Sequence, residues 1–394
     1  MRRAGAVLVA AVLLAGCTSS SPERPPSRSS ATNPPSQSTT PSGGTTRPAA
    51  GPRTVTILGS GDVLIHPQLW EQAHADARGE GRHGYDFGPM YASIAPDVRR
   101  ADLAICEMET PLAPPGGPFV GWPDFSAPPQ VLTALTGVGY RSCTTASNHT
   151  LDQGYTGLKR TLDELDAAGL RHTGSARSAT EAARPLIITT AGGVRVGQLA
   201  YSFNFNGHEP DAGRAWEANL IDVPAILAAA HRLKRAGADV VVLSMHWGVE
   251  YDHLATAEQR SQAHRLLASK DIDLILGDHA HVVQPAERIH GKWVFYCMGN
   301  QISRHADPIP ESREGLMPMI TFTENARHRF HVSAAVAIPT WMQDDPALRL
   351  VDLPRSLAGT SLTAAQRSEQ EAAHRAIVNY LDAYGAVGAG LVIR

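Results

Sequence analysis

Two histidines that follow a predicted strand are the residues best suited to chemistry. They lie in the segment GDHAH at positions 277–281, directly after the apolar run from Asp273 to Leu276. Neutral imidazole is the commonest metal ligand in proteins, and two rings on one turn can bracket one ion or serve two centres. We therefore interpret His279 and His281 as metal ligands.

A third imidazole, His246, follows the apolar run from Val240 to Met245. It would lie where a buried parallel strand reaches the crevice of a sheet. We interpret it as a ligand, with Glu250 or Asp252 available to orient its ring. The alternative is a histidine that only hydrogen-bonds to a loop.

Asn148 and His149 form a further candidate pair in the segment NHTLDQG at positions 148–154. An Asn oxygen can ligate a hard cation, and the neighbouring imidazole can protonate a leaving group. The alternative is that Asn148 or Asp152 only caps a helix that starts here. Asp62 and Glu109, each at the end of a predicted strand, supply carboxylates.

An alternation of strands and helices must bring these residues together. The predicted strands are Thr54 to Leu58, Leu103 to Cys106, Tyr140 to Ala146, Val240 to Ser244 and Asp273 to Leu276. The predicted helices are Gly88 to Arg100, Pro128 to Leu135, Tyr155 to Ala168, Val223 to Arg235 and Ala257 to Lys270. This order predicts an α/β sheet with helices on its faces, and ligands of such sheets bind beyond the carboxyl ends of the strands.

Hairpins interrupt the alternation, so we expect the sheets to be mixed. They are predicted at 186–201, across Gly192-Gly193, and at 285–298, across His290-Gly291. Beyond residue 305, two strands (319–323 and 330–338) and a closing helix (363–384) are expected to pack on the same domain.

Six motifs follow one another along the chain. They are GDVL at 61–64, EMETPL at 107–112, ASNHTLDQG at 146–154, HWGVEY at 246–251, GDHAHVVQ at 277–284 and YCMGN at 296–300. In this order they resemble the CapA family, the poly-gamma-glutamate capsule synthesis proteins, which is similar to the calcineurin-like metallophosphoesterases. The resemblance covers about residues 54–305 and implies a four-layer αββα sandwich of two mixed sheets with a metal centre at the sheet edge.

The resemblance also implies a set of metal ligands for one or two divalent transition ions, Mn, Fe or Zn. They are Asp62 and His281 for one metal, Asn148, His246 and His279 for the other, and Glu109 as the bridge. In such enzymes two cations lower the pKa of a shared water, and hydroxide attacks phosphorus in line. His149 would protonate the leaving oxygen, and Asp152 would orient His149.

Five departures from the implied pattern leave the number of metals open, one of which is Thr150, at the position directly after the Asn-His pair where an acid is normal. Leu64 stands where the first strand of a full metallophosphoesterase carries a histidine, and His66 is held in reserve for that role, although the proline after it disfavours the necessary turn. Glu109 stands where Asp is usual. Within the CapA pattern, Glu107 stands where Asn is common and Asp278 where His is common.

Loop residues after strands are candidates for binding substrate in the same crevice. We assign this role to Asn204 and Arg304, with Asn206 and His208 nearby, because a guanidinium suits a phosphate or a carboxylate. The alternative is that they are solvated loop residues.

The first 53 residues are predicted to form a signal peptide followed by a tether. A positive start, an apolar run from Ala6 to Leu14 and the lipobox-like LAGC at 14–17 predict a signal peptide over 1–17, with Cys17 lipidated after cleavage. Residues 18–53, almost all Ser, Thr, Pro and Gly, predict a disordered tether. The folded part is then 54–305 with a C-terminal extension over 306–394.

The other three cysteines, Cys106, Cys143 and Cys297, are odd in number and lie in apolar runs without C-x-x-C spacing. We therefore expect buried thiols rather than a disulfide.

Composition limits the partners. The 394 residues include 35 Lys plus Arg and 38 Asp plus Glu, a net charge of -3, which is too balanced for a field that gathers nucleic acid. We expect an extracytoplasmic protein, anchored to the membrane through lipidated Cys17, that acts on a cell-envelope or capsule-type polymer. It would be either a metal-dependent phosphoesterase-like hydrolase or a non-hydrolytic factor in the synthesis, export or anchoring of such a polymer.

Overall fold

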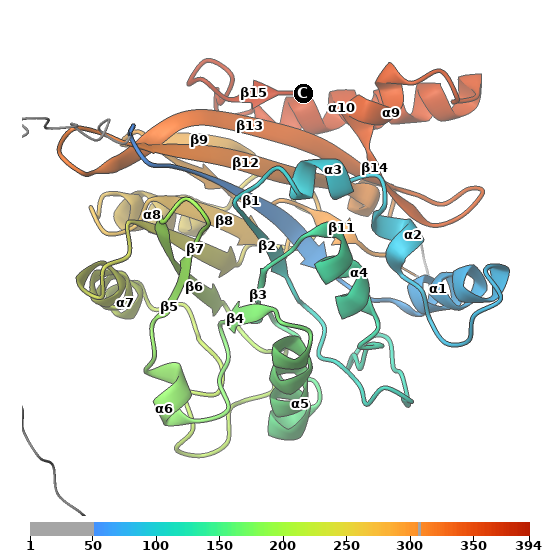
Figure 1. The fold of residues 1–394 in the computed structure, drawn as a ribbon, viewed down its shortest axis with the longest axis horizontal. Helices are drawn as coiled ribbons and strands as arrows, with labels where there is room; N and C mark the ends of the chain where they lie inside the picture. The colour runs from blue at the N-terminus through green and yellow to red at the C-terminus, as the bar shows by residue number, and fades with distance from the viewer. Residues whose placement is uncertain (1–50, 306–308) are drawn as a thin grey trace, which may run out of the picture. The chain divides into compact units, whose positions relative to one another are not determined.

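Two mixed β-sheets pack face to face in the computed structural model, which describes residues 51–305 and 309–394 (Figure 1). The predicted signal peptide, Cys17 and nearly all of the predicted tether lie outside the described residues. Within the described residues, no helix combines the length and the apolar character needed to cross a membrane.

The first sheet has nine strands in the order β14-β13-β12-β1-β2-β3-β4, with β11 beside β1 and β15 beside β13. The strands are β1 (Thr54–Val63), β2 (Leu103–Glu107), β3 (Ser142–Thr144), β4 (Arg171–Thr173), β11 (Asn300–Ile302), β12 (Glu314–Glu324), β13 (Phe330–Gln343), β14 (Arg349–Asp352) and β15 (Val392–Ile393). Strands β1 to β4 run parallel, whereas β12 is antiparallel to β1 and the strands β12, β13 and β14 are antiparallel to one another in turn. Beyond residue 305 the chain thus continues the same sheet.

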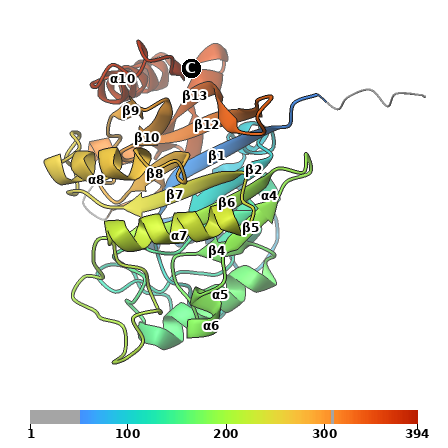
Figure 2. The same cartoon turned by 90° about the vertical axis from the view of Figure 1, so that its left-hand side faces the viewer.

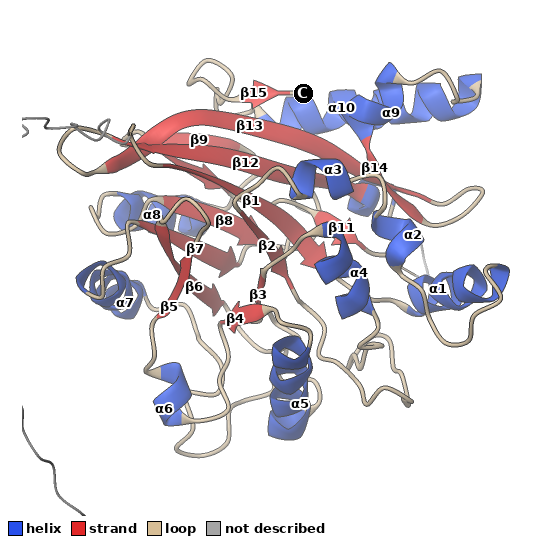
Figure 3. Ribbon diagram, viewed as in Figure 1, coloured by secondary structure: helices blue, strands red, loops and turns tan. Residues whose placement is uncertain are grey.

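The second sheet has six strands in the order β5-β6-β7-β8-β10-β9. They are β5 (Leu186–Thr189), β6 (Arg195–Ser202), β7 (Val240–His246), β8 (Leu274–Asp278), β9 (Ala286–Ile289) and β10 (Lys292–Phe295). Both predicted hairpins are present as the antiparallel pairs β5–β6 and β9–β10, and they flank a parallel centre. Figure 3 shows the two sheets and the helices around them.

Ten α-helices of the described residues surround the two sheets. They are α1 (Pro67–Gly79), α2 (Gly88–Tyr91), α3 (Ala95–Val98), α4 (Val131–Val138), α5 (Gly154–Ala167), α6 (Ala179–Ala182), α7 (Val223–Arg235), α8 (Ala257–Leu267), α9 (Leu353–Ala358) and α10 (Ala364–Leu381), with a 3-10 helix at Pro310–Arg313. Helices α1, α2, α4 and α5 pack on the outer face of the first sheet (Figure 1), and α7 and α8 on that of the second (Figure 2), whereas α9 and α10 pack on the face of the first sheet that also meets the second sheet. The order helix, sheet, sheet, helix confirms the predicted four-layer sandwich.

The apolar runs form central strands because both of their faces are buried. In β7, Val240 and Val242 pack between the two sheets, while Val241 and Leu243 pack under α7 and α8. Since successive side chains of a strand point to opposite faces, a continuous apolar run suits a strand covered on both sides.

Several predicted elements differ in extent: the strands expected over 319–323 and 330–338 are the longer β12 and β13, and α1 was not predicted. The first strand does not end at Leu58: it continues to Val63 through an irregular register around Gly59 to Asp62, because β11 pairs with its end. The single helix predicted over 88–100 is divided into α2 and α3. The strand predicted over 140–146 is only β3, three residues long.

The prediction of three free thiols is wrong for two of them. Cys106 and Cys143 form a disulfide between β2 and β3, and of the three cysteines in the described part of the chain only Cys297 is free, and it is buried. The two disulfide cysteines are register partners on adjacent parallel strands. That pairing is long-range, so spacing along the chain gives no signal for it.

Candidate metal centre

The carboxyl ends of β1 and β2 meet the carboxyl ends of β7 and β8 at one edge of the sandwich. A close backbone approach makes this possible: a Cβ on Gly61 would lie 1.7 Å from the carbonyl oxygen of Gly299, so only glycine lets the chain before β11 come so near to β1. Asp62 N donates to the same oxygen at 3.1 Å. Asp62 is thereby held beside its register partner Glu107.

All six predicted ligands lie in one buried cluster. His281 Nδ1 lies 3.1 Å from Asp62 Oδ2, and His281 Nε2 lies 3.7 Å from Glu109 Oε1. His246 Nε2 lies 2.8 Å from Asn148 Oδ1, and the rings of His246 and His279 are 4.9 Å apart between centroids. Oδ1 of Asp62 also lies 3.9 Å from Nδ1 of His246.

A carboxylate absent from the predicted ligand set completes the cluster. Glu107 Oε1 lies 3.8 Å from His246 Nδ1, and Asp62, Glu107 and His246 have ligand atoms within 4.8 Å of one another. A second such group is Asp62, Glu109 and His281. The sequence signal for Glu107 was available, since it ends an apolar strand two residues before Glu109, but we interpreted it only as a departure from a family pattern.

The buried polar atoms of this cluster fit a cation. Both carboxylate oxygens of Glu107 and of Glu109 are buried without a hydrogen-bond partner, as are Nδ1 of His246 and Nδ1 of His279. Unpaired buried carboxylates are costly, and a metal ion supplies both the opposite charge and the missing contacts. Oxygen and imidazole donors in this mixture suit a divalent transition ion.

The electrostatics of the cluster also favour a bound cation. Burial and then the carboxylates of Asp62 and Glu109 raise the pKa of Glu107 and Asp278 well above their usual range. Burial and then His281 lower the pKa of His279 to about 3, which leaves a neutral ring, the form that ligates metals. Burial lowers the pKa of His281, but Glu109 and Asp62 outweigh it and raise that pKa to about 10. A cation would take the place of that proton.

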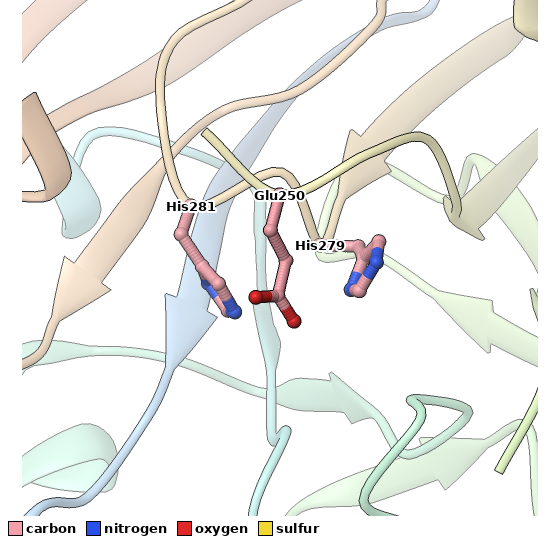
Figure 4. Close-up of side chains that lie close together, drawn as sticks. All are labelled: Glu250, His279 and His281. Carbon is pink, nitrogen blue, oxygen red and sulfur yellow. The ribbon is translucent and has the colours of Figure 1, made fainter. Parts of the chain in front are cut away.

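The turn after β8 is strained at both of its histidines. His279 has φ 93° and His281 has φ 56°, in the left-handed region that costs non-glycine residues about 1–3 kcal/mol. Figure 4 shows the Glu250 carboxylate between the two rings, with which it forms a third group. The expectation that Glu250 or Asp252 orients His246 is therefore wrong: the contacts of His246 are to Asp62, Glu107, Glu109 and Asn148.

His149 and Asp152 form a buried pair next to the cluster. His149 Nδ1 lies 2.7 Å from Asp152 Oδ2, and the same oxygen accepts a hydrogen bond from Phe125 N at 2.8 Å. The alternative of a simple helix cap is wrong, because α5 begins at Gly154, with Gln153 in the cap position and no side-chain cap. With Asp152 held at Nδ1, Nε2 is the nitrogen of His149 that can give or take a proton.

A cleft of about 730 Å³ opens beside Asn148 and His149. Its described lining also includes Leu64, His66 and Asn206. His66 belongs to none of the ligand groups. Its Nδ1 lies 3.2 Å from the carbonyl oxygen of Leu64 and accepts from Arg304 N, so the residue held in reserve does not replace the missing first-strand histidine.

The two residues predicted to bind substrate lie outside this lining. Arg304 is paired with Asp344 at 3.4 Å. The side chain of Asn204 accepts a hydrogen bond from Asn206 N at 3.1 Å, in a turn that lines a neighbouring pocket. Asn206 instead reaches the site, because its Oδ1 accepts from Asn148 Nδ2 at 3.3 Å.

The fold and the cluster together define a four-layer α/β protein with a carboxylate- and histidine-rich candidate metal centre at a sheet edge. The model of the family described as "Bacterial capsule synthesis protein PGA_cap" matches residues 56–305. The chain belongs to this family, and the resemblance to CapA proteins is confirmed.

Curated relatives include the PGA biosynthesis protein CapA of Bacillus subtilis, 28% identical over 52% of this chain and 53% of that protein. The capsule biosynthesis protein CapA of Bacillus anthracis is 26% identical over 63% of this chain and 59% of that protein. The chain thus spans little more than half the length of these relatives. A probable polyglutamine synthesis accessory protein of Mycobacterium tuberculosis is 26% identical over 64% of this chain and 76% of that protein.

Similar solved structures include the calcineurin-like phosphoesterase YfkN from Bacillus subtilis, with 15% identity, a TM-score of 0.45 and coverage of 84% of this chain and 99% of that one. The 5'-nucleotidase precursor from Thermus thermophilus has 14% identity, a TM-score of 0.46 and coverage of 83% and 58%.

Proposed function

We propose that the protein is a metal-dependent, phosphoesterase-like hydrolase that acts on a cell-envelope or capsule-type polymer. The observation that carries the proposal is the buried pair of His149 and Asp152, which adjoins the candidate metal cluster and opens on the cleft. A protein that only held a metal for stability would have no need of an oriented imidazole at a cleft.

The proposed chemistry divides between the cluster and the pair. A bound divalent ion would supply an activated water and would neutralise charge on the phosphoryl group. Asp62, Glu107, Glu109, Asn148, His246, His279 and His281 would hold one or two such ions. Asp152 would keep the proton of His149 on Nδ1, and His149 would deliver a proton from Nε2 to the leaving oxygen.

A second function is favoured by one residue. Leu64 is 2% exposed and stands where a full metallophosphoesterase has an imidazole ligand. A weaker first metal site fits a non-hydrolytic factor for the synthesis, export or anchoring of poly-gamma-glutamate or a capsule polymer. In that case the metal would organise polymer binding.

We further propose that the protein is extracytoplasmic and anchored to the membrane through lipidated Cys17. The Cys106–Cys143 disulfide supports the compartment, because such bonds persist in oxidising environments. Replacing Cys17 with Ala should release the full chain from the membrane fraction into the soluble fraction. Continued membrane attachment of Cys17→Ala would contradict the anchor.

Hydrolysis should be tested with the full chain in detergent. Elemental analysis is expected to find a transition metal that is lost in His279→Ala and in His281→Ala. With added manganese, the wild type should hydrolyse a generic phosphodiester or monoester, and His149→Ala should lower kcat by about 100-fold or more, the usual contribution of a general acid.

The matched control is His83→Ala, an exposed histidine, which should leave both metal content and hydrolysis unchanged. If the wild type binds metal but hydrolyses neither substrate, the hydrolase proposal is contradicted and the non-hydrolytic factor remains. A folded chain that takes up no metal would contradict both.

A further inference from the structure

Glu250 is the one exposed member of the three groups of described residues that include His246 or His281. Its carboxylate lies between the rings of His279 and His281 (Figure 4), and one ligand atom from each of these three residues lies within 4.8 Å of the other two. Two ligands of a single ion lie at most about 4.4 Å apart, which is twice a metal–ligand distance of about 2.2 Å. Small side-chain movements therefore suffice for Glu250 to share an ion with a cluster histidine.

The loop that carries Glu250 is bound to the turn that carries the two histidines. At the start of the loop, Trp247 N donates to the carbonyl oxygen of Asp278 at 3.2 Å. Beyond Glu250, Tyr251 N donates to the carbonyl oxygen of Ala280 at 2.8 Å. Tyr251 has φ 63°, a left-handed conformation that is rare for a bulky residue. The two hydrogen bonds hold Glu250 over the histidine turn.

The groups around Glu250 do not explain its place by pairing among themselves. His281 already has two ion-pair contacts, to Asp62 at 3.1 Å and to Glu109 at 3.7 Å. Both carboxylate oxygens of Glu109 and Nδ1 of His279 are buried without a hydrogen-bond partner, and these residues are 1% and 4% exposed. A further carboxylate beside Asp62 and Glu109 adds repulsion unless a cation lies among them.

The ion implied at Asp62 and His281 lacks an imidazole at the first strand, where the chain has Leu64. Leu64, Glu250 and His281 line the same cleft, so the Glu250 carboxylate lies on the side of the site where Leu64 brings no donor. We infer that Glu250 is a ligand of this ion and takes the coordination position that a histidine at residue 64 would hold. The inference rests on the proposed function, because it completes the metal centre that the function requires.

Replacing an imidazole with a carboxylate changes which ion the site prefers. With Glu250, the donors for this ion are one imidazole, from His281, and three carboxylates, from Asp62, Glu109 and Glu250. Carboxylate oxygens suit Mn²⁺, whereas imidazole nitrogens suit Zn²⁺. The change at residue 64 then alters the metal preference of the site rather than the number of its ligands.

The test measures metal binding apart from hydrolysis. Isothermal titration calorimetry of the metal-free full chain in detergent is carried out with Mn²⁺ and separately with Zn²⁺. Glu250→Ala should weaken Mn²⁺ binding at least about tenfold, since loss of a group that only orients a ligand already costs about that much. Glu250→His should still bind an ion, and its ratio of Zn²⁺ affinity to Mn²⁺ affinity should exceed that of the wild type. Both variants change an exposed side chain, so we expect them to fold.

A second variant and a control separate ligation from charge. In Leu64→His/Glu250→Ala an imidazole returns at the first strand, so Mn²⁺ binding should recover about tenfold relative to Glu250→Ala although no negative charge is restored. Glu250→His alone decides if this change at buried Leu64 prevents folding. The matched control is Glu209→Gln, at an exposed acid that lines a neighbouring pocket, which should bind both ions as the wild type does.

Equal Mn²⁺ binding by the wild type and Glu250→Ala would overturn Glu250 as a ligand and leave the proposed function intact. Weaker binding by Glu250→Ala, without a shift toward Zn²⁺ in Glu250→His and without recovery in the double variant, would also overturn it, because Glu250 would then act only through its charge. A wild type that takes up no metal would contradict the proposed function and the inference together. Metal binding that depends on Glu250 in a protein without hydrolytic activity would support the inference and contradict only the hydrolase.

Discussion

At the scale of single residues, Asn206 shows how a loop far along the chain can set the orientation of a candidate ligand. Its Oδ1 accepts from Nδ2 of Asn148, which directs the other end of that amide, Oδ1, toward His246. Its own backbone has φ 51°, a left-handed conformation that Asn tolerates, and it is fixed by the bond from its N–H to Asn204. The amide of Asn148 is thus held with its oxygen toward His246, the orientation that ligation of a metal by this oxygen would need.

We therefore expect Asn206→Ala to weaken manganese binding about tenfold, the usual effect of removing a group that orients a ligand. Asn206→Asp should bind nearly as the wild type does, because a carboxylate oxygen can still accept from Asn148. Isothermal titration calorimetry of the metal-free chain measures both. If Asn206→Ala and Asn206→Asp weaken binding equally, Asn206 does not act through Asn148.

The imidazoles of the cluster could be predicted from sequence because each follows an apolar strand, a local signal. Glu107 was missed as a member of the cluster because its role depends on His246, from the other sheet. The pairing of His149 with Asp152 is predictable, because the two residues are three positions apart and one turn of the chain brings them together. A local sequence pattern gives no information on which residues of the two sheets contact each other.

At the scale of elements, the parallel strands β2 and β3 are joined covalently near the site. Cys106 and Cys143 are 37 residues apart in sequence, so their disulfide removes the entropy of a sizeable loop from the unfolded chain. The loop model gives a stabilisation of about 2–4 kcal/mol. The bond also fixes β2, which ends at Glu107.

The double variant Cys106→Ala/Cys143→Ala should lower the free energy of unfolding by about 2–4 kcal/mol, measured by urea denaturation with oxidised wild type as the reference. Dithiothreitol should lower the stability of the wild type and leave the double variant unchanged. Cys297, the free cysteine of the described chain, stays in both proteins and serves as the internal control. A reductant effect on the double variant would show that another thiol chemistry is involved.

Length alone did not make an element predictable, because the 13-residue helix α1 was not predicted whereas α7, of the same length, was. Helix α7 has the predicted bounds, since Asp222 caps it and a proline lies in its first turn. The range 88–100 contains two short helices of four residues each, α2 and α3, which pack on the first sheet and its neighbours rather than following helical periodicity. Tertiary contacts determine where such short helices form, and a local sequence pattern does not reveal those contacts.

At the scale of the whole molecule, the four-layer sandwich buries a cluster of acidic side chains. In the absence of a metal, burial and the neighbouring carboxylates raise the pKa of Glu107, Glu109 and Asp278 above their usual range. Despite its burial, His281 has its pKa raised to about 10 by Glu109 and Asp62. In both cases the folded state holds protons that the unfolded chain releases at lower pH.

A raised folded-state pKa gives stability that is present below the unfolded pKa and is lost as pH rises through the folded pKa. We therefore expect the Tm of metal-free protein to fall as pH rises from about 6.5 to about 10, the interval in which the folded state keeps the His281 proton that the unfolded chain has released. His246 and His279, whose pKa values are lowered, act in the opposite direction only below their unfolded value of 6.5. A bound cation replaces the protons, so the manganese-loaded protein should be more stable and less sensitive to pH.

Differential scanning fluorimetry of the full chain, with EDTA or with manganese, measures the two curves. Glu314 provides an internal control, because burial raises its pKa to about 8 and its loss of a proton lowers the stability of both forms alike. The difference between the curves therefore reports the cluster, and it should widen as pH rises. Parallel curves would mean that the carboxylates and His281 do not exchange protons for a metal ion.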